Sequence, residues 1–226
     1  RVDVLINNAA IIQIGPLANL SVEDFDDTMK TNFFGPLYAI LAVLPEMKRR
    51  REGRIVNVAS VGGKVGLPHL LPYVASKYAL GGFSKGLRAE VAKDGVVVTT
   101  VFPNLTRTGS SRNTIVKGQH EREYAWFKIA DALPLLSDTA ESTAADIITA
   151  LKNGDAELVV TMSGKFFALV NEIFPELTTD VLGLINRFLP GSGSDQAKRG
   201  YESESRRSRG AIARLSDEAA ERNNEI

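Results

Sequence analysis

The chain has 226 residues, of which 44% are hydrophobic and 24% charged, as is typical of a globular protein with a full core. Its 27 basic and 27 acidic residues cancel, which argues against a nucleic-acid partner. It contains no cysteine, which excludes disulfides, thiolate catalysis and cysteine-based zinc sites, and with two histidines we expect no metal site. The lack of cysteine fits a reducing compartment, so we expect a cytoplasmic protein.

The start of the chain runs from Arg1 directly into an apolar segment. We therefore expect the sequence to be truncated at its N-terminus, with any targeting signal upstream of Arg1. A strand at residues 2–6 would then form an open sheet edge, and we expect the 226 residues alone to aggregate. No run reaches the ~20 apolar residues that a membrane-spanning helix needs.

Regular elements alternate along the chain. Short apolar runs predict buried strands at residues 2–6, 54–59, 96–102 and 157–162. Apolar periodicity and capping residues predict helices at residues 21–51, 72–92, 137–151 and 165–189. We expect a kink at Gly35-Pro36 and an interruption at Pro175. Residues 104–136 show no clear pattern, and residues 191–226 resemble a disordered tail with a fragile helix near 211–222.

This alternation predicts an α/β fold in which helices cover both faces of a parallel sheet. We expect one domain over residues 1–190, followed by the tail at 191–226. Ligands of such sheets bind beyond the C-terminal ends of the strands. The residues that follow the predicted strands are Asn7-Asn8, Ser60, Pro103-Asn104 and Ser163-Gly164.

Tyr73 and Lys77 lie four residues apart on a predicted helix, so their side chains share a face. An ammonium beside a phenol favours the phenolate and lowers the tyrosine pKa, which would allow proton exchange near neutral pH. A Tyr-xxx-Lys pair also arises often by chance, so this pair alone does not identify a site.

Three further positions each allow a functional and a purely structural interpretation. Ser60 lies 13 residues before Tyr73 and either donates a hydrogen bond to a substrate oxygen or caps a loop. Asn32 lies in a predicted helix and either holds an ordered water at a helix break or is a satisfied core residue. The small residues of Asn7-Asn8-Ala9-Ala10 either admit a ligand close to the backbone or form a plain turn.

Together these residues resemble the short-chain dehydrogenase/reductase family. Asn7-Asn8-Ala9 is similar to its NNAG segment, and Pro103 with Thr108 to its PGxxxT segment. The family's catalytic set is matched, in order and spacing, by Asn32, Ser60, Tyr73 and Lys77. The resemblance spans about residues 2–162. It implies a single-domain Rossmann-like fold, a doubly wound parallel sheet in three αβα layers, seen here from its fourth strand onward and without its first strands.

The resemblance also implies an NAD- or NADP-dependent oxidoreductase that interconverts a ketone or aldehyde and an alcohol. Tyr73 would be the general acid/base, and Lys77 would lower its pKa and hold the nicotinamide ribose. Ser60 would polarise the substrate oxygen, and Asn32 would support a water linked to Lys77. The cofactor-binding residues would be Asn7, Ala9, Tyr73, Lys77, Pro103, Asn104 and Thr108.

Two departures from the family bear on the cofactor. The glycine-rich turn, TGxxxGxG, does not occur in the 226 residues, and the residue that selects NAD or NADP would lie upstream with it. Ala10 and Asn104 each replace a glycine of the family pattern. We therefore expect the 226 residues alone to bind cofactor weakly and to be weakly active or inactive. A non-catalytic fragment or binding protein on the same fold is the alternative, with a sugar epimerase or dehydratase as a further one.

The substrate is expected to be a small carbonyl or alcohol compound with a hydrophobic group. Residues 104–136 fall where the family has its substrate-covering loop, and the aromatic and apolar residues of this loop either form an apolar wall or pack beneath it: Tyr124, Trp126, Phe127 and Ile129. We expect His69 at the surface. Residues 165–189 are open to three interpretations: a dimer face, a pocket wall or a membrane-surface segment. We also expect a homo-oligomer.

Overall fold

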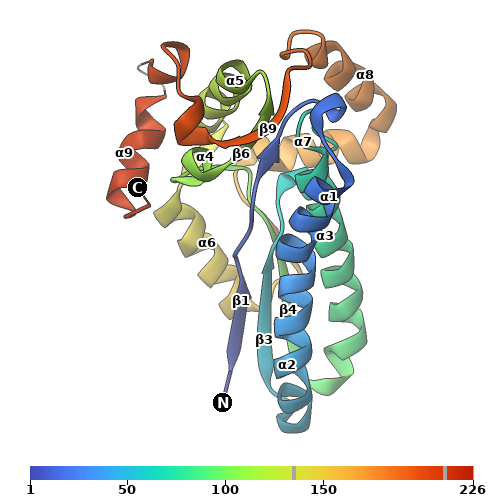
Figure 1. The fold of residues 1–226 in the computed structure, drawn as a ribbon. Helices are drawn as coiled ribbons and strands as arrows, with labels where there is room; N and C mark the ends of the chain where they lie inside the picture. The colour runs from blue at the N-terminus through green and yellow to red at the C-terminus, as the bar shows by residue number, and fades with distance from the viewer. Residues whose placement is uncertain (134–135, 211–212, 226) are drawn as a thin grey trace.

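The main sheet of the protein is parallel, as predicted. The structure is a computed structural model that describes residues 1–133, 136–210 and 213–225. Four strands pair in parallel in the order β1-β3-β4-β8 (Figure 1). They are β1 (Val4–Asn7), β3 (Gly53–Val58), β4 (Val96–Phe102) and β8 (Glu157–Val159).

Helices cover both faces of this sheet. Successive strand residues point to opposite faces, so Ile55 packs in a core cluster with Ile40, whereas Val56 packs in another with Leu151. The result is a three-layer α/β fold, and Figure 1 shows two helices on one side of the sheet and a third on the other. These helices are α2 (Gly35–Arg50) and α3 (Leu71–Val91) on the first face, and α6 (Ala140–Asn153) on the second.

The long helix predicted at 21–51 is continuous, but its middle is π-helical and not α-helical. It consists of α1 (Val22–Met29), the π-helical segment η2 (Lys30–Phe34) and α2. The irregularity therefore lies just before the predicted kink at Gly35-Pro36. Ser21 and Asp24 form the capping box that begins α1. A wide π turn of this kind often marks a functional site, and it contains Asn32.

Residues 104–136 contain regular structure that the sequence pattern did not reveal. In chain order their elements are β5 (Leu105–Arg107), α4 (Ser110–Asn113), β6 (Ile115–Gly118) and α5 (His120–Ala132). These strands pair with distant segments, β7 (Ser137–Thr139) for β5, and β2 (Gln13–Ile14) and β9 (Ser194–Arg199) for β6. Such short strands carry too few residues to show a period. Residues 134–135 lie outside the described residues.

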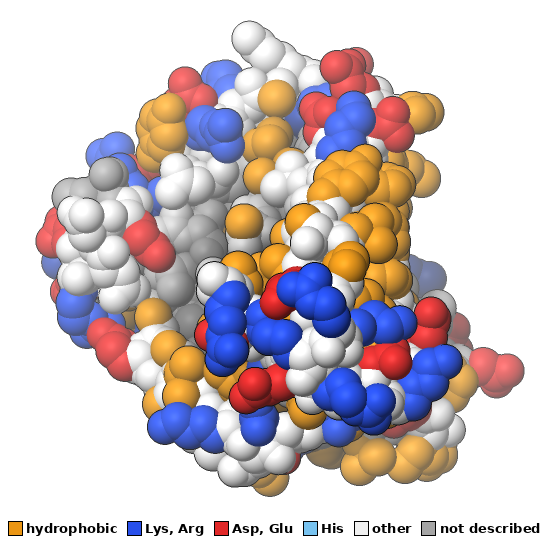
Figure 2. All heavy atoms as spheres, turned by 90° about the horizontal axis from the view of Figure 1, so that it is seen from below, with side chains coloured by type: hydrophobic (Ala, Val, Ile, Leu, Met, Phe, Trp, Pro, Cys, Tyr) orange, Lys and Arg blue, Asp and Glu red, His pale blue; other side chains and the backbone are white. Residues whose placement is uncertain are grey.

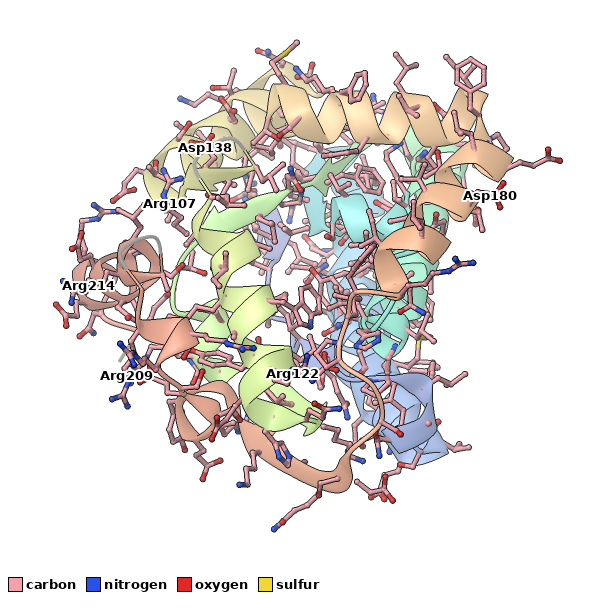
Figure 3. The ribbon with its side chains drawn as sticks, turned by 90° about the horizontal axis from the view of Figure 1, so that it is seen from above. Arg107, Arg122, Asp138, Asp180, Arg209 and Arg214 are labelled. Carbon is pink, nitrogen blue, oxygen red and sulfur yellow. The ribbon has the colours of Figure 1, made fainter. Side chains whose placement is uncertain are left out.

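The expectation of a disordered tail over 191–226 differs from the structure, in which its described residues are folded against the domain. β9 pairs antiparallel with β6, and α9 (Arg214–Arg222) packs against α5. The fully buried ammonium of Lys128 on α5 pairs with Asp217 at 2.7 Å and with Glu204 at 3.4 Å. Acidic residues of the tail thus compensate the charge of the buried Lys128 ammonium. In Figure 3 the tail residues Arg209 and Arg214 lie beyond α5, on the side away from α3.

Two amphipathic helices occupy the region predicted as one interrupted helix at 165–189. They are α7 (Met162–Ile173) and α8 (Pro175–Asn186), divided at Pro175 as expected. Several of their large apolar side chains are exposed, among them Phe166, Leu177 and Leu184. Within the described residues no helix combines the length and the apolar character needed to cross a membrane.

β1 lies at the edge of the described sheet, as predicted. β1 has β3 as its neighbour in the sheet and exposes Val4 and Ile6 at 42% each. Seen from below, the molecule shows Lys and Arg side chains interspersed with Asp and Glu (Figure 2). Lys48 in the last turn of α2, for example, pairs with Asp94 at 2.8 Å. The remaining short helical turns are η1 (Leu17–Asn19), η3 (Val61–Gly63), η4 (Ala92–Asp94), η5 (Gly200–Ser203) and η6 (Arg207–Arg209).

Candidate active site

The structure brings the four candidate catalytic residues together at the C-terminal end of β3. Ser60 lies two residues beyond β3 and caps η3. Tyr73 and Lys77 lie in the first two turns of α3, with the Lys77 ammonium 5.6 Å from the centre of the Tyr73 ring. Asn32, in η2, reaches the same helix through Ser76.

Ser60 caps the turn that follows β3, which is one of its two predicted roles. Its hydroxyl accepts a hydrogen bond from the Gly62 amide at 3.0 Å, and a Cβ added at Gly62 would lie 3.4 Å from this hydroxyl oxygen and 3.5 Å from the Tyr73 ring, so the two side chains flank Gly62. Close packing of η3 on α3 brings these side chains together, because a Cβ on Gly63 would lie 2.6 Å from the Lys77 carbonyl oxygen. Glycine at 63 therefore allows the Ser60 turn to approach the tyrosine helix.

The pKa of Tyr73 departs from the sequence prediction. Burial raises the pKa of the Tyr73 phenol, and the nearby Ser60 hydroxyl opposes this effect only in part. The Lys77 ammonium does not lower it, because Lys77 donates instead to the Val58 carbonyl at 2.8 Å and lies over the ring. The phenol is therefore held in its neutral form at neutral pH.

Lys77 is the buried cation of this site, with 2% of its surface exposed. Burial lowers the pKa of Lys77 to about 8, because the ammonium loses hydration. An ammonium has three N–H donors, and the Val58 carbonyl takes one. Within the described part of the chain, the remaining donors are available to a polar ligand or to water.

This shift predicts a rise in stability at alkaline pH. Between pH 8 and 10.5, the unfolded chain keeps the Lys77 proton that the folded chain has released, so unfolding takes up a proton and stability increases with pH. The expected rise between pH 8 and 10 is about 3 kcal/mol at most. Urea unfolding of the wild type and of Lys77→Met should show the rise in the wild type alone. Parallel pH profiles for the two proteins would contradict it.

Asn32 is fully buried, and its side-chain amide forms hydrogen bonds with other groups of the protein. The amide oxygen accepts from the Ile11 N–H at 2.8 Å, and the amide nitrogen donates to the Ile11 carbonyl at 3.0 Å and to the Ser76 hydroxyl at 2.9 Å. Ser76 in turn donates to the Tyr73 carbonyl at 2.7 Å. The side chain thus fixes the start of the tyrosine helix, and its two donors are already used without a water.

Replacing Asn32 with Ala should destabilise the protein by about 2 kcal/mol, because the buried backbone groups of Ile11 lose their partner. Denaturant unfolding measures this change. The exposed Asn153→Ala, at the end of α6, serves as control and should change stability by less than about 0.5 kcal/mol. Equal effects of the two substitutions would show that the Ile11 contacts contribute nothing.

The expected cofactor residues divide into two groups. Asn7 belongs to a polar chain through the sheet, from Asn7 to Asn57 at 2.8 Å and from Asn57 to Ser84 at 3.0 Å. Thr100 donates to the same Ser84 hydroxyl at 2.8 Å. Ala9 is exposed just beyond β1. In this group, the exposed small residue Ala9 follows β1, whose end is held to β3 by the hydrogen bond from Asn7 to Asn57.

The second group follows β4. The Pro103 carbonyl accepts from the Val61 amide at 2.8 Å, which joins it to the Ser60 turn. Asn104 donates to the Leu136 carbonyl at 2.9 Å, so the residue that replaces the family glycine fixes the loop instead. Thr108 bonds to Ser110 at the start of α4 and makes no side-chain hydrogen bond to the catalytic set among the described residues.

A buried polar cluster beside Tyr73 escaped the sequence analysis. His69 was expected at the surface but is 8% exposed, with a left-handed backbone (φ 62°). Its Nδ1 lies 2.9 Å from both oxygens of Glu123, which is fully buried on α5. Trp126 donates to the same carboxylate at 2.8 Å. No local pattern signals this contact, because the sequence separates His69 and Glu123 by 54 residues.

The aromatic residues of α5 divide between buried and half-buried positions. Tyr124 and Phe127 are buried in an apolar cluster with Ile14, Leu70, Val74 and Val116. Trp126 is half-buried and packs against the outside of this cluster, as Tyr73 does. Ile129 is likewise half-buried. Tyr124 and Phe127 therefore lie in the core, whereas Trp126 and Tyr73 pack against the outside of the same cluster.

Comparison with known proteins agrees with this fold. The family model for short chain dehydrogenases matches residues 1–117, which is half of the chain. The chain belongs to the short-chain dehydrogenase family.

Particular relatives are known from several organisms. The chain is 47% identical over 107 residues to dehydrogenase/reductase SDR family member 7C of Xenopus tropicalis, which covers 47% of this chain and 34% of the relative. It is 35% identical over 160 residues to member 7B of Bos taurus, covering 71% of this chain and 48% of the relative. The chain thus spans about a third to a half of the length of these curated relatives.

A solved structure has the same fold. It is a short chain dehydrogenase from Burkholderia cenocepacia in complex with NADP, 26% identical, with a TM-score of 0.65. The match covers 80% of this chain and 68% of that one.

Proposed function

We propose that this chain carries the catalytic residues of an NAD- or NADP-dependent oxidoreductase that interconverts a ketone or aldehyde and an alcohol. The observation that carries the proposal is the grouping of the Tyr73 side chain with the Ser60 hydroxyl across Gly62 and with the buried Lys77 ammonium, 5.6 Å from the centre of the ring. Burying an ammonium without a carboxylate partner costs free energy. A proton-transfer site gives a use for a phenol and a buried ammonium at this distance, which a purely structural role does not.

In the direction of reduction, Tyr73 acts as general acid. Its raised pKa keeps the phenol protonated at neutral pH, and the much more basic alkoxide that develops on the substrate takes that proton. Ser60 donates its hydroxyl hydrogen to the substrate oxygen and orients it toward the phenol. Lys77, held on the Val58 carbonyl with its ammonium 5.6 Å from the centre of the ring, leaves the phenol protonated until the substrate takes the proton.

The residues present fit the nicotinamide half of the cofactor. Lys77 keeps unused N–H donors in a buried site, which suits the hydroxyl groups of a ribose. Exposed Ala9 beyond β1 and the turn at Pro103 flank this position without large side chains. The bound cofactor would supply the hydride, and the related NADP complex supports this assignment.

A hydrophobic substrate fits the surroundings of Tyr73. The half-buried ring of Trp126 packs on the same apolar cluster, together with Ile12 and Leu67. We expect these residues to contact an apolar substituent of the ketone. A homo-oligomer, a cytoplasmic location and a domain boundary near residue 190 stay predictions.

The test is oxidation of NADH and NADPH, followed at 340 nm, by the gene product that contains these 226 residues, against a panel of ketones and aldehydes. We expect turnover of apolar ketones that is lost in Tyr73→Phe. Absence of turnover across the panel, with cofactor binding shown by fluorescence, would favour a non-catalytic binding protein.

A further inference from the structure

We propose that Glu123 is a positioning residue that holds Trp126 as a wall of the substrate pocket beside Tyr73, so that the contact Glu123–Trp126 sets how large an apolar group the substrate carries. This inference rests on the proposed function. It assigns a role to the buried cluster of His69, Glu123 and Trp126, which the proton transfer itself does not use.

The burial of Glu123 needs an explanation beyond stability. Its side chain is fully buried, and a buried carboxylate is rarely more stabilising than a packed apolar side chain of similar volume. A carboxylate can instead fix the orientation of neighbouring side chains, because it accepts hydrogen bonds at defined positions from several donors at once. Glu123 uses both oxygens in this way, toward His69 Nδ1 and Trp126 Nε1.

The two groups that Glu123 contacts come from different segments of the chain. Trp126 lies three residues after Glu123 on α5, so the two side chains share one helix face. His69 lies two residues before α3, the helix that carries Tyr73. Glu123 therefore links α5 to the N-terminal end of α3, where the Tyr73 phenol lies.

The backbone of His69 supports the same conclusion. A non-glycine residue in the left-handed region stores strain that the surroundings must offset. The His69 carbonyl accepts from the Gly15 amide at 2.8 Å, and its ring is held by Glu123. The histidine is thus fixed at both its backbone and its ring.

The indole of Trp126 is fixed in orientation but keeps part of its surface open. Phe127 lies edge-on to it at 5.8 Å between ring centres and His69 at 6.4 Å. The ring packs on the cluster that Tyr73 also contacts. A flat apolar wall at this place accommodates a ketone with an aryl or alicyclic substituent, and loosening the ring should weaken binding of such substrates most.

The first arm of the test needs no substrate. Trp126 is the sole tryptophan in the 226 residues, so the emission of the chain reports on this ring. Glu123→Gln, which keeps the shape but loses the charge and one acceptor, should shift the emission to the red and increase quenching by acrylamide. Glu121→Gln, an exposed glutamate on the same helix, is the matched control and should leave both unchanged.

The second arm uses methyl ketones whose other substituent grows from ethyl to phenyl and naphthyl. Glu123→Gln should raise KM for the naphthyl ketone about tenfold, as expected from one lost charged hydrogen bond, with a smaller change in kcat and in KM for butanone. Trp126→Phe keeps an aromatic ring without the N–H donor and should raise the same KM. A purely structural role would instead lower kcat/KM equally for all substrates.

Three outcomes overturn the proposal: unchanged emission in Glu123→Gln, equal losses across the ketone series, or no change of KM in Trp126→Phe. Failure of the proposed function is distinguishable, because then the wild type and Glu121→Gln reduce no ketone at all. In that case the emission of Glu123→Gln still decides whether Glu123 positions the indole.

Discussion

Replacing Tyr73 with Phe is expected to lower kcat for ketone reduction by a factor of about 100 to 10,000, the range that general acid catalysis contributes. The substitution removes one oxygen atom and keeps the ring that packs on the apolar cluster beside Trp126. The alkoxide that forms on the substrate then has no proton donor within reach, since Ser60 alone cannot replace an acid. Steady-state kinetics under saturating NADH or NADPH measures the loss, and KM should change little.

The control for this substitution lies on the same helix. Tyr78 is 43% exposed, and Tyr78→Phe removes the same atom away from the site. Its kcat should remain within about twofold of the wild type. Comparable rates in Tyr73→Phe and wild type would remove Tyr73 from the chemistry, and the proposed mechanism with it.

A second large effect is expected on stability. Replacing Lys128 with Met should destabilise the protein by about 3 kcal/mol, at the lower end of the range for breaking a buried ion pair. The lower end applies because Glu204 and Asp217 are 19% and 32% exposed and regain water when the ammonium is lost. Urea unfolding measures the change, and limited trypsin digestion should show faster cleavage near Arg206 and Arg209.

Lys152→Met provides the comparison, since Lys152 is exposed on α6 and makes no ion pair among the described residues. It should leave both the unfolding midpoint and the digestion pattern unchanged. If Lys128→Met left the tail as resistant to trypsin as in the wild type, β9 and backbone contacts alone would hold the tail in place.

The main sheet could be predicted from the sequence because each of its strands is a short apolar run that can be recognised without knowing its neighbours. Residues such as Ile55 and Val98 lie in apolar runs bounded by turns, and a doubly covered sheet requires such runs. The tail was mispredicted because its order depends on distant partners. Local composition around Glu204 and Asp217 is that of a disordered segment, and nothing local shows that Lys128 needs them.

The proximity of Ser60, Tyr73 and Lys77 was predicted from the sequence, but the electrostatics of these residues were not. The spacing of Ser60, Tyr73 and Lys77 can be read from the chain. The direction of the Tyr73 pKa cannot, because it depends on how deeply the phenol is buried and on where the Lys77 ammonium points. His69 shows the same limit, since its burial requires a carboxylate from another helix.

The polar chain of Asn7, Asn57 and Ser84 has a consequence for how this scaffold accommodates new substrates. Ser84 ties the middle of α3 to the strands, while Ser76 and Asn32 tie its beginning to the segment before β2. Restrained at both places, α3 is held against sliding and rotation. Adaptation to a differently shaped molecule is therefore expected through exchange of half-buried side chains on α5, such as Trp126 and Ile129, and not through movement of α3.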